Sequence, residues 1–346
     1  MKTLLKLLKM SLCLSLMLLV VSCADQKKTL YLYNWADYLS PQLVKDFEEK
    51  NNCRVVISYF DSNESMYAKM KAGAQGYDLI FPTSYIAAVM AKQNMLMPLD
   101  KSRIPNIKYM MPDILEKLED AKMEYSIPYA VSFSGIGYNN EVVTDFKPSW
   151  NMFGNKKYAG RMTMLNDVRQ TFGAALKYLG YSFNSTNDKE VEAARNLLME
   201  WKKNLASFTV DDAKLGIASK DFMVIQGYNG DILQIGKEKK YVSFAVPEEG
   251  TALAVDLMVI PSSAKNPELA YAFINYMHDP EVCAKNMVFI NYLMPNTAAA
   301  KLIPQELKDN PSFMMKPDVF QKSEVLRDLG DYNQTYIKYW NLIKAK

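Results

Sequence analysis

From Thr29 onward, short apolar runs alternate with amphipathic stretches. The apolar runs are rich in β-branched and aromatic residues and cover positions 29–33, 55–60 and 77–81. Two helical patterns separate them, one started by Ser40-Pro41 and the other by Ser62 or Asn63. Strands that alternate with helices predict βαβ units and a parallel sheet, in which ligands bind beyond the carboxyl ends of the strands. We therefore expect an α/β fold with a site at that edge.

Two further helices are indicated later in the chain. Residues 187–205 carry an apolar stripe at helical spacing, and Asn187 with Glu190 has the spacing of a capping box. A second helix is expected over 266–277, with His278 at the end where the helix dipole favours a cation. We interpret His278 as a structural residue.

We expect two short segments, 126–138 and 250–261, to carry the chain between two lobes. The first contains Gly135 and Gly137, but no third glycine or helix start follows, as a dinucleotide-binding fingerprint would require. We expect these glycines to absorb backbone rotation at a hinge.

The first 22 residues have a different character, with three lysines followed by an apolar run. This pattern predicts a cleaved signal peptide, since the run is too short for a comfortable membrane span. The segment 20–23, Val-Val-Ser-Cys, resembles a bacterial lipobox, although Leu is commoner than Val at its first position. The resemblance implies a lipid anchor on Cys23 and a tether over 23–28; the alternative is an ordinary signal with an incidental cysteine.

Charge and composition narrow the function classes. The 346-residue chain is long enough for two domains, and it carries 41 basic and 38 acidic residues. Removing the three lysines of the signal leaves 38 of each sign, so nothing predicts a nucleic-acid partner.

The cysteine and histidine content excludes several chemistries. Cys53 and Cys283 are expected to be buried free thiols, with a disulfide between them left open because export would permit one. His278 is the only histidine and no CxxC pair exists, which argues against a zinc site or a histidine-based catalytic triad. We expect no metal, no cofactor and no enzymatic activity.

Several loops combine an aromatic residue with a carboxylate or a hydroxyl group. They cover 33–38, 81–85, 166–170, 227–231 and 291–296, and Asp256 lies within an apolar run. Aromatic faces can cover methylene groups and attract cations, while carboxylates neutralise charges that burial would make costly. The combination suits a ligand with ammonium groups on an alkyl chain, although any single loop of this kind is more often a cap or core filler.

The order of these loops resembles that of the spermidine/putrescine-binding proteins of ABC polyamine importers. The matching segments are Leu32-Tyr33-Asn34-Trp35 with Tyr38, the run 62–71, Tyr77-Asp78-Leu79-Ile80, Tyr125-Ser126-Ile127-Pro128-Tyr129, Asp256, Ile260-Pro261 and Pro295-Asn296. The resemblance extends from about Thr29 to Tyr339.

The resemblance implies a type II periplasmic-binding-protein fold of two lobes, each a mostly parallel sheet flanked by helices. Lobe 1 would comprise 29–134 with 256–300, and lobe 2 would comprise 135–255 with 301–346. The protein would be a periplasmic, membrane-anchored monomer that closes around putrescine or spermidine and delivers it to the permease of an ABC importer.

The same resemblance assigns roles to individual residues. The implied ligand-binding residues are Trp35, Asp37, Tyr38, Thr83, Tyr85, Asp167, Gln170, Tyr228, Asp231, Asp256 and Tyr292. Trp35 and Tyr38 would enclose the methylene chain, Asp37 would hold one ammonium group, and Asp231 and Asp256 would lie near the other.

Three positions depart from the spermidine type. Ala254 replaces a large aromatic residue, Gln170 replaces Glu, and Leu326 replaces a polar amide. In addition, Tyr228-x-Gly230-Asp231 looks like the aromatic-x-Gly-Asp run of the putrescine type. Because a third buried ammonium would lack a partner at position 170, we expect putrescine to be preferred over spermidine.

Two other functions stay open at this point. The same fold could bind another small ligand such as ferric iron, since iron binders use tyrosine clusters and the chain has 22 tyrosines. A cell-envelope hydrolase is the second alternative, although no GxSxG elbow is present.

Overall fold

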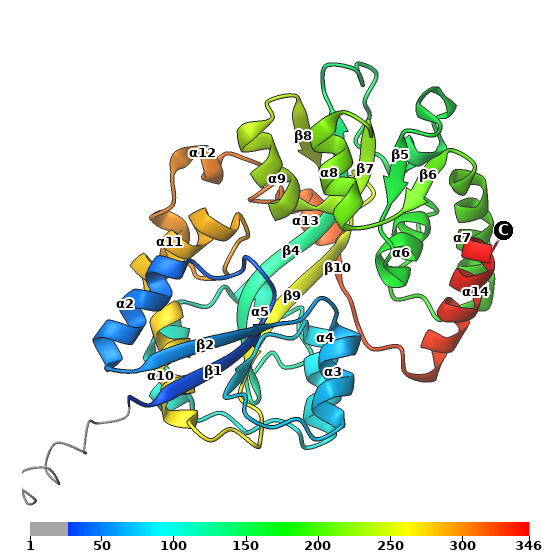
Figure 1. Cartoon of the computed structure of the whole chain (residues 1–346). Helices are drawn as coiled ribbons and strands as arrows, with labels where there is room; N and C mark the ends of the chain where they lie inside the picture. The colour runs from blue at the N-terminus through cyan, green and yellow to red at the C-terminus, as the bar shows by residue number, and fades with distance from the viewer. Residues whose placement is uncertain (1–26, 346) are drawn as a thin grey trace, which may run out of the picture.

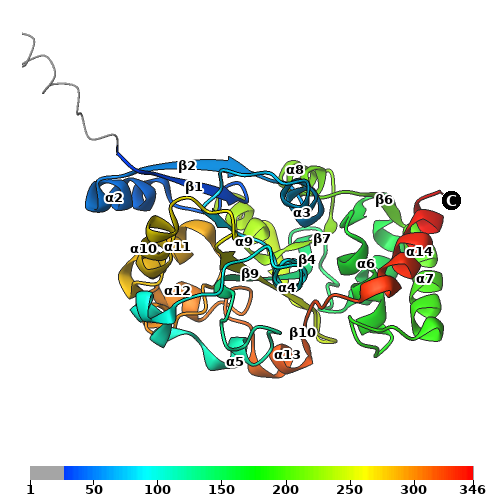
Figure 2. The ribbon, with the colours of Figure 1, turned by 90° about the horizontal axis from the view of Figure 1, so that it is seen from below.

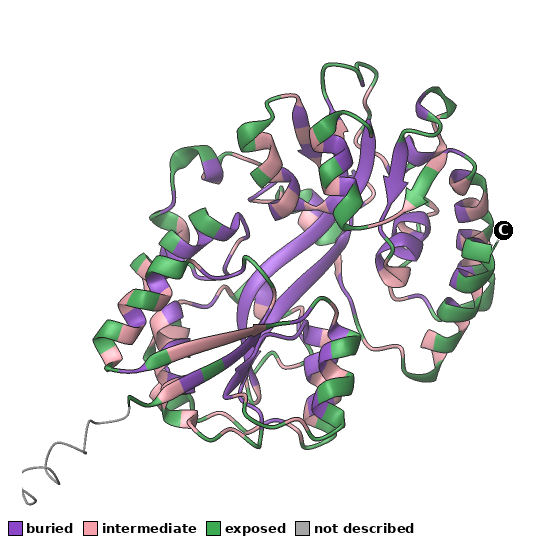
Figure 3. Cartoon of the chain, viewed as in Figure 1, coloured by how far each residue is buried: buried purple, intermediate pink, exposed green. Residues whose placement is uncertain are grey.

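The computed structural model describes residues 27–345, so the predicted signal peptide and Cys23 lie outside the described residues. Two lobes, each with its own sheet and helices, are joined by the long strands β4 (Ser126–Asn139) and β9 (Ala252–Val259) (Figure 1). β9 is buried along its whole length and β4 at every position except Tyr138, and both strands run through the centre of the molecule (Figure 3). The expected α/β fold with two lobes is confirmed.

Lobe 1 is built on a mixed sheet with the strand order β2-β1-β3-β9-β4. The additional strands are β1 (Thr29–Asn34), β2 (Arg54–Tyr59) and β3 (Leu79–Ile80). β1 pairs in parallel with β2 and β3, as the βαβ pattern predicted, whereas β9 runs antiparallel to β3 and β4. The helices of this lobe are α2 (Pro41–Asn51), α3 (Asn63–Lys71), α4 (Ser84–Lys92), α5 (Pro112–Leu115), α10 (Pro267–Met277) and α11 (Pro280–Ile290).

Lobe 2 continues the sheet through the second half of β4. The strand order is β4-β7-β5-β6, and β8 pairs with the other edge of β4. The strands are β5 (Met162–Met164), β6 (Leu205–Phe208), β7 (Val224–Tyr228) and β8 (Val242–Ala245), and the helices are α6 (Val168–Tyr178), α7 (Asp188–Lys202), α8 (Asp211–Ser219) and α9 (Asn229–Glu238). Short 3-10 helices complete the chain: η1 (Lys101–Arg103), η2 (Pro105–Tyr109), η3 (Trp150–Gly154), η4 (Lys156–Tyr158), η5 (Ala299–Lys301) and η6 (Gly330–Tyr332).

Strand β4 changes partner where the lobes meet. It pairs with β9 through Phe133 and with β7 from Ser134 onward. Crossover segments were predicted at 126–138 and 250–261, and β4 and β9 occupy these positions. The lobe boundaries themselves stay a prediction.

The C-terminal segment contacts both lobes. After α12 (Gln305–Lys308) and α13 (Pro317–Lys322), the short β10 (Glu324–Val325) pairs in parallel with β9. α14 (Asn333–Ala345) then packs against α6 and α7 on the outer side of lobe 2 (Figure 2). Ile303, Leu307 and Phe313 belong instead to the lobe 1 core. The segment 301–346 thus contributes to the cores of both lobes, and its assignment to lobe 2 stays a prediction.

The glycines of β4 lie where neighbouring elements pack closely on the strand, and the hinge role expected from the sequence stays a prediction. Gly135 lies in a regularly paired strand, and a Cβ atom there would lie 2.4 Å from the Phe244 ring and 2.7 Å from the Ala245 carbonyl oxygen. A Cβ atom on residue 137 would lie 3.0–3.3 Å from side-chain atoms of Ile225 and Ile232. The missing side chains allow β8 and α9 to pack closely on β4.

The predicted capping box at α7 is only half formed. Asn187 caps the helix by accepting a hydrogen bond from the Lys189 backbone N–H. Glu190 does not return to Asn187, because the Ser185 hydroxyl donates to Glu190 and accepts from the Asn187 N–H. Ser185 thus takes the place that the box would give to Glu190.

Cys53, Cys283 and His278 are all buried. Both cysteines are free thiols, and burial raises the pKa of each. His278 is the C-cap of α10 and has a structural position, but burial lowers its pKa to about 3. The ring is therefore neutral at physiological pH and not the cation that the helix-dipole argument favoured. Within residues 27–345, no helix is both long and apolar enough to cross a membrane.

Candidate ligand-binding cleft

Most of the predicted site residues follow strand ends, and they lie where the lobes adjoin. Trp35 and Tyr38 follow β1, Thr83 and Tyr85 follow β3, and Tyr228 ends β7. Asp167 caps α6 after β5, Asp231 lies in the first turn of α9, Asp256 lies within β9, and Tyr292 follows α11. The rule that ligands bind beyond the carboxyl ends of strands accounts for the residues after β1, β3, β5 and β7, but not for Asp256 or Tyr292.

Asp256 is the centre of a buried hydrogen-bond network. The Tyr38 hydroxyl donates to its Oδ2 atom and the Thr83 hydroxyl donates to its Oδ1 atom, each at 2.6 Å. The residue is 6% exposed, and burial raises the pKa of its carboxyl to about 6 although both hydrogen bonds oppose the rise. Among the described residues, no lysine, arginine or histidine nitrogen lies within 4.0 Å of this carboxylate. A buried carboxylate in this state favours a cationic ligand.

Asn63 orients Thr83 toward Asp256. Its Nδ2 atom donates to the Thr83 hydroxyl oxygen at 2.9 Å, and its Oδ1 atom accepts from the Thr83 backbone N–H at 3.1 Å. The Thr83 hydroxyl hydrogen is then left for Asp256. Sequence reasoning did not select Asn63, although it follows the end of β2 as the other site residues follow their strands.

Trp35 is held by contacts within lobe 1. Its indole N–H donates to the Phe81 carbonyl oxygen at 2.9 Å, and its ring packs on Phe60 with centroids 4.3 Å apart. The Trp35 residue as a whole is half-buried. Burial raises the pKa of Tyr38 well above its ordinary value, so its hydroxyl remains a donor to Asp256.

Tyr292 and Tyr228 lie where the lobes adjoin. The Tyr292 ring meets Tyr38 edge-on with centroids 5.6 Å apart, and its hydroxyl donates to Asp231 Oδ1 at 3.3 Å. Burial, together with the charges of Asp167, Asp231 and Asp256, raises the pKa of Tyr228 well above its ordinary value. Tyr228 therefore lies among carboxylates that come from several elements.

Asp231 already has a cationic partner. Its Oδ2 atom lies 3.7 Å from the Lys214 Nζ atom on α8. Burial raises the pKa of the Asp231 carboxyl, and the Lys214 charge opposes that rise. Sequence reasoning missed Lys214, since nothing in the order of residues places α8 against α9.

Asp167 and Glu64 form a second acidic group beside Tyr85. Asp167 accepts from the Gln170 backbone N–H at 2.9 Å, and burial and the Glu64 charge raise the pKa of its carboxyl. The Tyr85 hydroxyl donates to Glu64 Oε1 at 3.2 Å. Glu64 is exposed at the start of α3 and was not selected from the sequence, because an acid in a first helical turn is ordinarily explained by the helix dipole.

Gln170 is 2% exposed, and its side-chain Oε1 atom has no partner among the described residues. Its backbone carbonyl accepts from the Gln226 side chain, which fixes the start of α6 against β7. The amide therefore offers a free acceptor but no formal charge.

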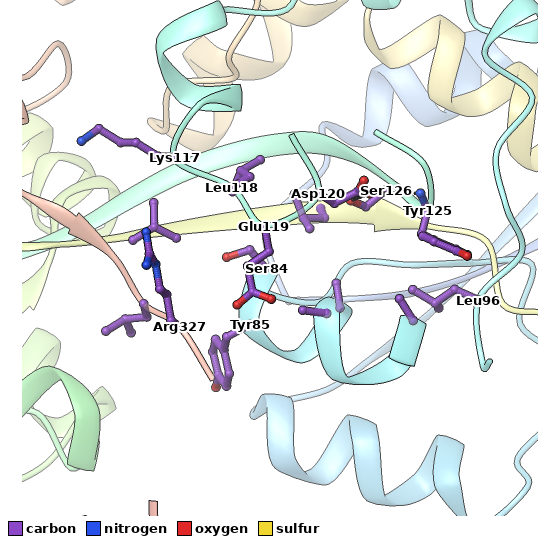
Figure 4. Close-up of a pocket in the computed structure, with 16 residues that line it drawn as sticks. Ser84, Tyr85, Leu96, Lys117, Leu118, Glu119, Asp120, Tyr125, Ser126 and Arg327 are labelled. Carbon is purple, nitrogen blue, oxygen red and sulfur yellow. Dashed lines mark hydrogen bonds between the residues drawn. The ribbon is translucent and has the colours of Figure 1, made fainter. Parts of the chain in front are cut away.

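Two of the departing positions adjoin the site. Ala254 and Asp256 are two residues apart on β9 and so share one face of the strand. Leu326 lines a pocket with Ser84, Tyr85 and Arg327, and Tyr85 and Arg327 lie at the same end of it (Figure 4). Both positions are apolar and buried, so neither adds a polar contact.

Asp37 is the one predicted site residue outside this buried group. It is exposed on the turn before Tyr38, with a left-handed φ of 55°. Its role as an ammonium ligand stays a prediction. Among residues 27–345, no group of three or more His, Cys, Asp and Glu side chains is arranged to hold a metal ion.

Two lobes joined by two crossing strands, with a buried carboxylate between them, define a type II solute-binding protein. A family model described as bacterial extracellular solute-binding protein matches residues 42–315. The chain belongs to this family.

Individual relatives agree with the resemblance noted from the sequence. The chain is 33% identical to the spermidine/putrescine-binding periplasmic protein of Escherichia coli K12 over 324 residues, 93% of each chain. It is 32% identical to the putrescine/cadaverine-binding protein of Pseudomonas aeruginosa PAO1 over 337 residues, which cover 93% of this chain and 95% of that one. The crystal structure of the TpPotD lipoprotein of Treponema pallidum superimposes with a TM-score of 0.86 at 32% identity, covering 92% of this chain and all of the other.

Proposed function

We propose that this protein binds a polyamine between its lobes and delivers it to the permease of an ABC importer. Asp256 carries the proposal, because a buried carboxylate with two hydroxyl donors and no cationic side chain beside it is suited to an ammonium group. The names of the relatives, which refer to spermidine, putrescine and cadaverine, support the same ligand class. Solute-binding proteins of this kind are transport components rather than enzymes.

The proposed ligand-binding residues are those expected from the sequence, but we expect them to contribute unequally to the binding affinity. Tyr38, Tyr228 and Tyr292, together with Trp35, would cover the methylene groups, while Thr83 and Tyr85 would hold the carboxylates in place. Asp256 would bind one ammonium group and Asp167 the other. Asp37 and Asp231 would contribute less, the first because it is exposed and the second because Lys214 neutralises it.

We further propose that putrescine binds more tightly than spermidine. Gln170 supplies no charge, and Ala254 and Leu326 supply no polar contact, so a third buried ammonium would lack a partner. Titration calorimetry with both polyamines at one pH and one salt concentration tests the proposal. Tighter spermidine binding would reverse the preference, and binding of neither would refute the ligand class.

A ferric-iron ligand is tested with the same preparation. Iron coordinated by tyrosines would colour the protein on addition of ferric citrate. We expect no absorbance change, because the hydroxyls of Tyr38 and Tyr292 donate to carboxylates and their pKa values are raised by burial.

The anchor remains part of the proposal. Cys23 would carry lipid after removal of residues 1–22, which would anchor the protein to a membrane in the periplasm. Cys23→Ala should lose incorporation of labelled palmitate, whereas Cys53→Ala, which alters a buried thiol, should keep it. Equal labelling of the Cys23 variant would refute the assignment.

A further inference from the structure

Lys214 brings a protein cation into the binding cleft. Its Nζ atom lies 3.1 Å from Asp211 Oδ1 on the same helix and 3.7 Å from Asp231 Oδ2 on α9. Lys214 also lines a pocket together with Tyr228 and Asp231, both of which belong to the proposed site. The Lys214 side chain is 37% exposed, so it is neither free in solvent nor fully enclosed by the protein.

Asp231 has no oxygen left without a partner. One oxygen faces Lys214, and the other accepts the Tyr292 hydroxyl from the opposite lobe. The Tyr292 ring approaches closely because residue 230 is glycine. Asp231 is therefore held at the contact between the lobes, where its charge acts on anything bound between them.

We infer that Lys214 is a specificity-determining residue, a tethered ammonium that occupies the cation position beside Asp231. A ligand charge placed near Asp231 meets the lysine instead of an unpaired carboxylate. Ligands with two ammonium groups can use Asp256 and Asp167, whereas a third group placed near Asp231 finds that acid already paired with Lys214. This inference rests on the proposed function, because it concerns which polyamine that cleft accepts.

The inference follows from the charge balance of the cleft. Two cations that share one carboxylate repel each other, and the repulsion is strongest where water is partly excluded. Removing the lysine charge leaves Asp231 as an acceptor for an additional ammonium group. The effect therefore depends on Asp231, and a double substitution should cancel it.

The test compares putrescine and spermidine binding to the wild-type protein and to Lys214→Met, which keeps side-chain length and removes the charge. We expect the ratio of spermidine to putrescine association constants to rise about tenfold or more, the size of effect that one charge pair near a protein surface can produce. Adding Asp231→Asn to Lys214→Met should return the ratio toward the wild-type value. Thermal unfolding of each variant establishes that it is folded.

Lys220→Met is the matched control. Lys220 lies at the C-cap of the same helix and pairs with Glu141 at 2.9 Å on the surface, outside the proposed site. It should leave the ratio unchanged. An unchanged or lower ratio in Lys214→Met, or an equal rise in Lys220→Met, overturns the inference while the polyamine function stands. If the wild-type protein binds neither polyamine, the proposed function fails and the inference falls with it.

Discussion

At the scale of single residues, Asp256 has opposite effects on binding and on stability. In the cleft it is a buried carboxylate with two hydroxyl donors and no cationic side chain beside it. Removing one partner of a buried charge pair costs about 3–5 kcal/mol. We expect Asp256→Asn to weaken polyamine binding at least about a hundredfold. Trp35→Ala should lose less, because a cation–π contact contributes about 0.5–2 kcal/mol.

Calorimetry on both variants, with circular dichroism to verify folding, measures this difference. An Asp256→Asn protein that binds polyamine as well as the wild type would remove Asp256 from the site. A larger loss in Trp35→Ala than in Asp256→Asn would mean that aromatic contacts, rather than charge pairing, dominate the affinity.

The same carboxylate should lower the stability of the ligand-free protein. The folded-state pKa of Asp256 is about 6, above its ordinary value of 3.8. The folded state therefore holds the proton more tightly than the unfolded state. The protonated carboxyl contributes to the free energy of unfolding, and this contribution is complete below about pH 4 and is lost as the pH rises through about 6. A shift of this size corresponds to about 3 kcal/mol.

We therefore predict that ligand-free Asp256→Asn is more stable than the wild type at pH 7.5 and similar to it at pH 4. Denaturant unfolding at the two pH values checks this. A pH-independent difference between the two proteins would show that ionisation of Asp256 is not its cause.

At the scale of elements, the sequence predicts where strands and helices lie along the chain better than it predicts how long they are. The strand-and-helix alternation correctly predicts β1, β2, α2 and α3, because their local patterns agree with their final surroundings. The expected strand 77–81 is only Leu79–Ile80, although the Asp78 and Phe81 backbone N–H groups beside it also donate to carbonyl oxygens of β1. The Asp78 carboxylate in addition accepts backbone N–H groups of Lys265 and Asn266. That contact joins segments about 190 residues apart and cannot be read from local pattern.

In the candidate site, too, local sequence pattern predicts some features, whereas contacts between distant elements determine others. Strand-end placement explains why Tyr38 and Thr83 lie close together, but not why Asp256 in the interior of β9 meets them, nor which carboxylates are already paired. Lys214 and Glu64 were missed because their partners lie on other elements. Asn63 was missed because its role is to orient Thr83 rather than to contact a ligand by itself.

The packing role of the β4 glycines gives an element-scale prediction. Gly135→Ala places a Cβ atom against the Phe244 ring and a backbone oxygen, so we expect a loss of about 1–3 kcal/mol in the free energy of unfolding. Ala206→Val, at an exposed position of β6, is the control and should change that energy by less than about 0.5 kcal/mol. Wild-type stability of Gly135→Ala combined with impaired binding would instead favour a hinge role.

At the scale of the whole molecule, the lobes meet where the Tyr292 ring lies across Gly230. A Cβ atom on residue 230 would come within 2.4–2.6 Å of that ring. Gly230 belongs to the first turn of α9 in lobe 2, whereas Tyr292 packs in the core of lobe 1. Gly230→Ala should therefore hinder approach of the lobes without disturbing either core.

This substitution separates closure from folding, because alanine is the better helix former by about 1 kcal/mol. We expect Gly230→Ala to keep or raise the free energy of unfolding. It should weaken polyamine binding about tenfold or more, because a displaced Tyr292 also loses its hydrogen bond to Asp231 and its ring contact with Tyr38. Small-angle scattering with and without putrescine should show less compaction than in the wild type. Combining Gly230→Ala with Tyr292→Ala removes the clash, so compaction should return even though the ring contact is lost. Failure of the double variant to compact would mean that Tyr292 itself, rather than the space above Gly230, is what brings the lobes together.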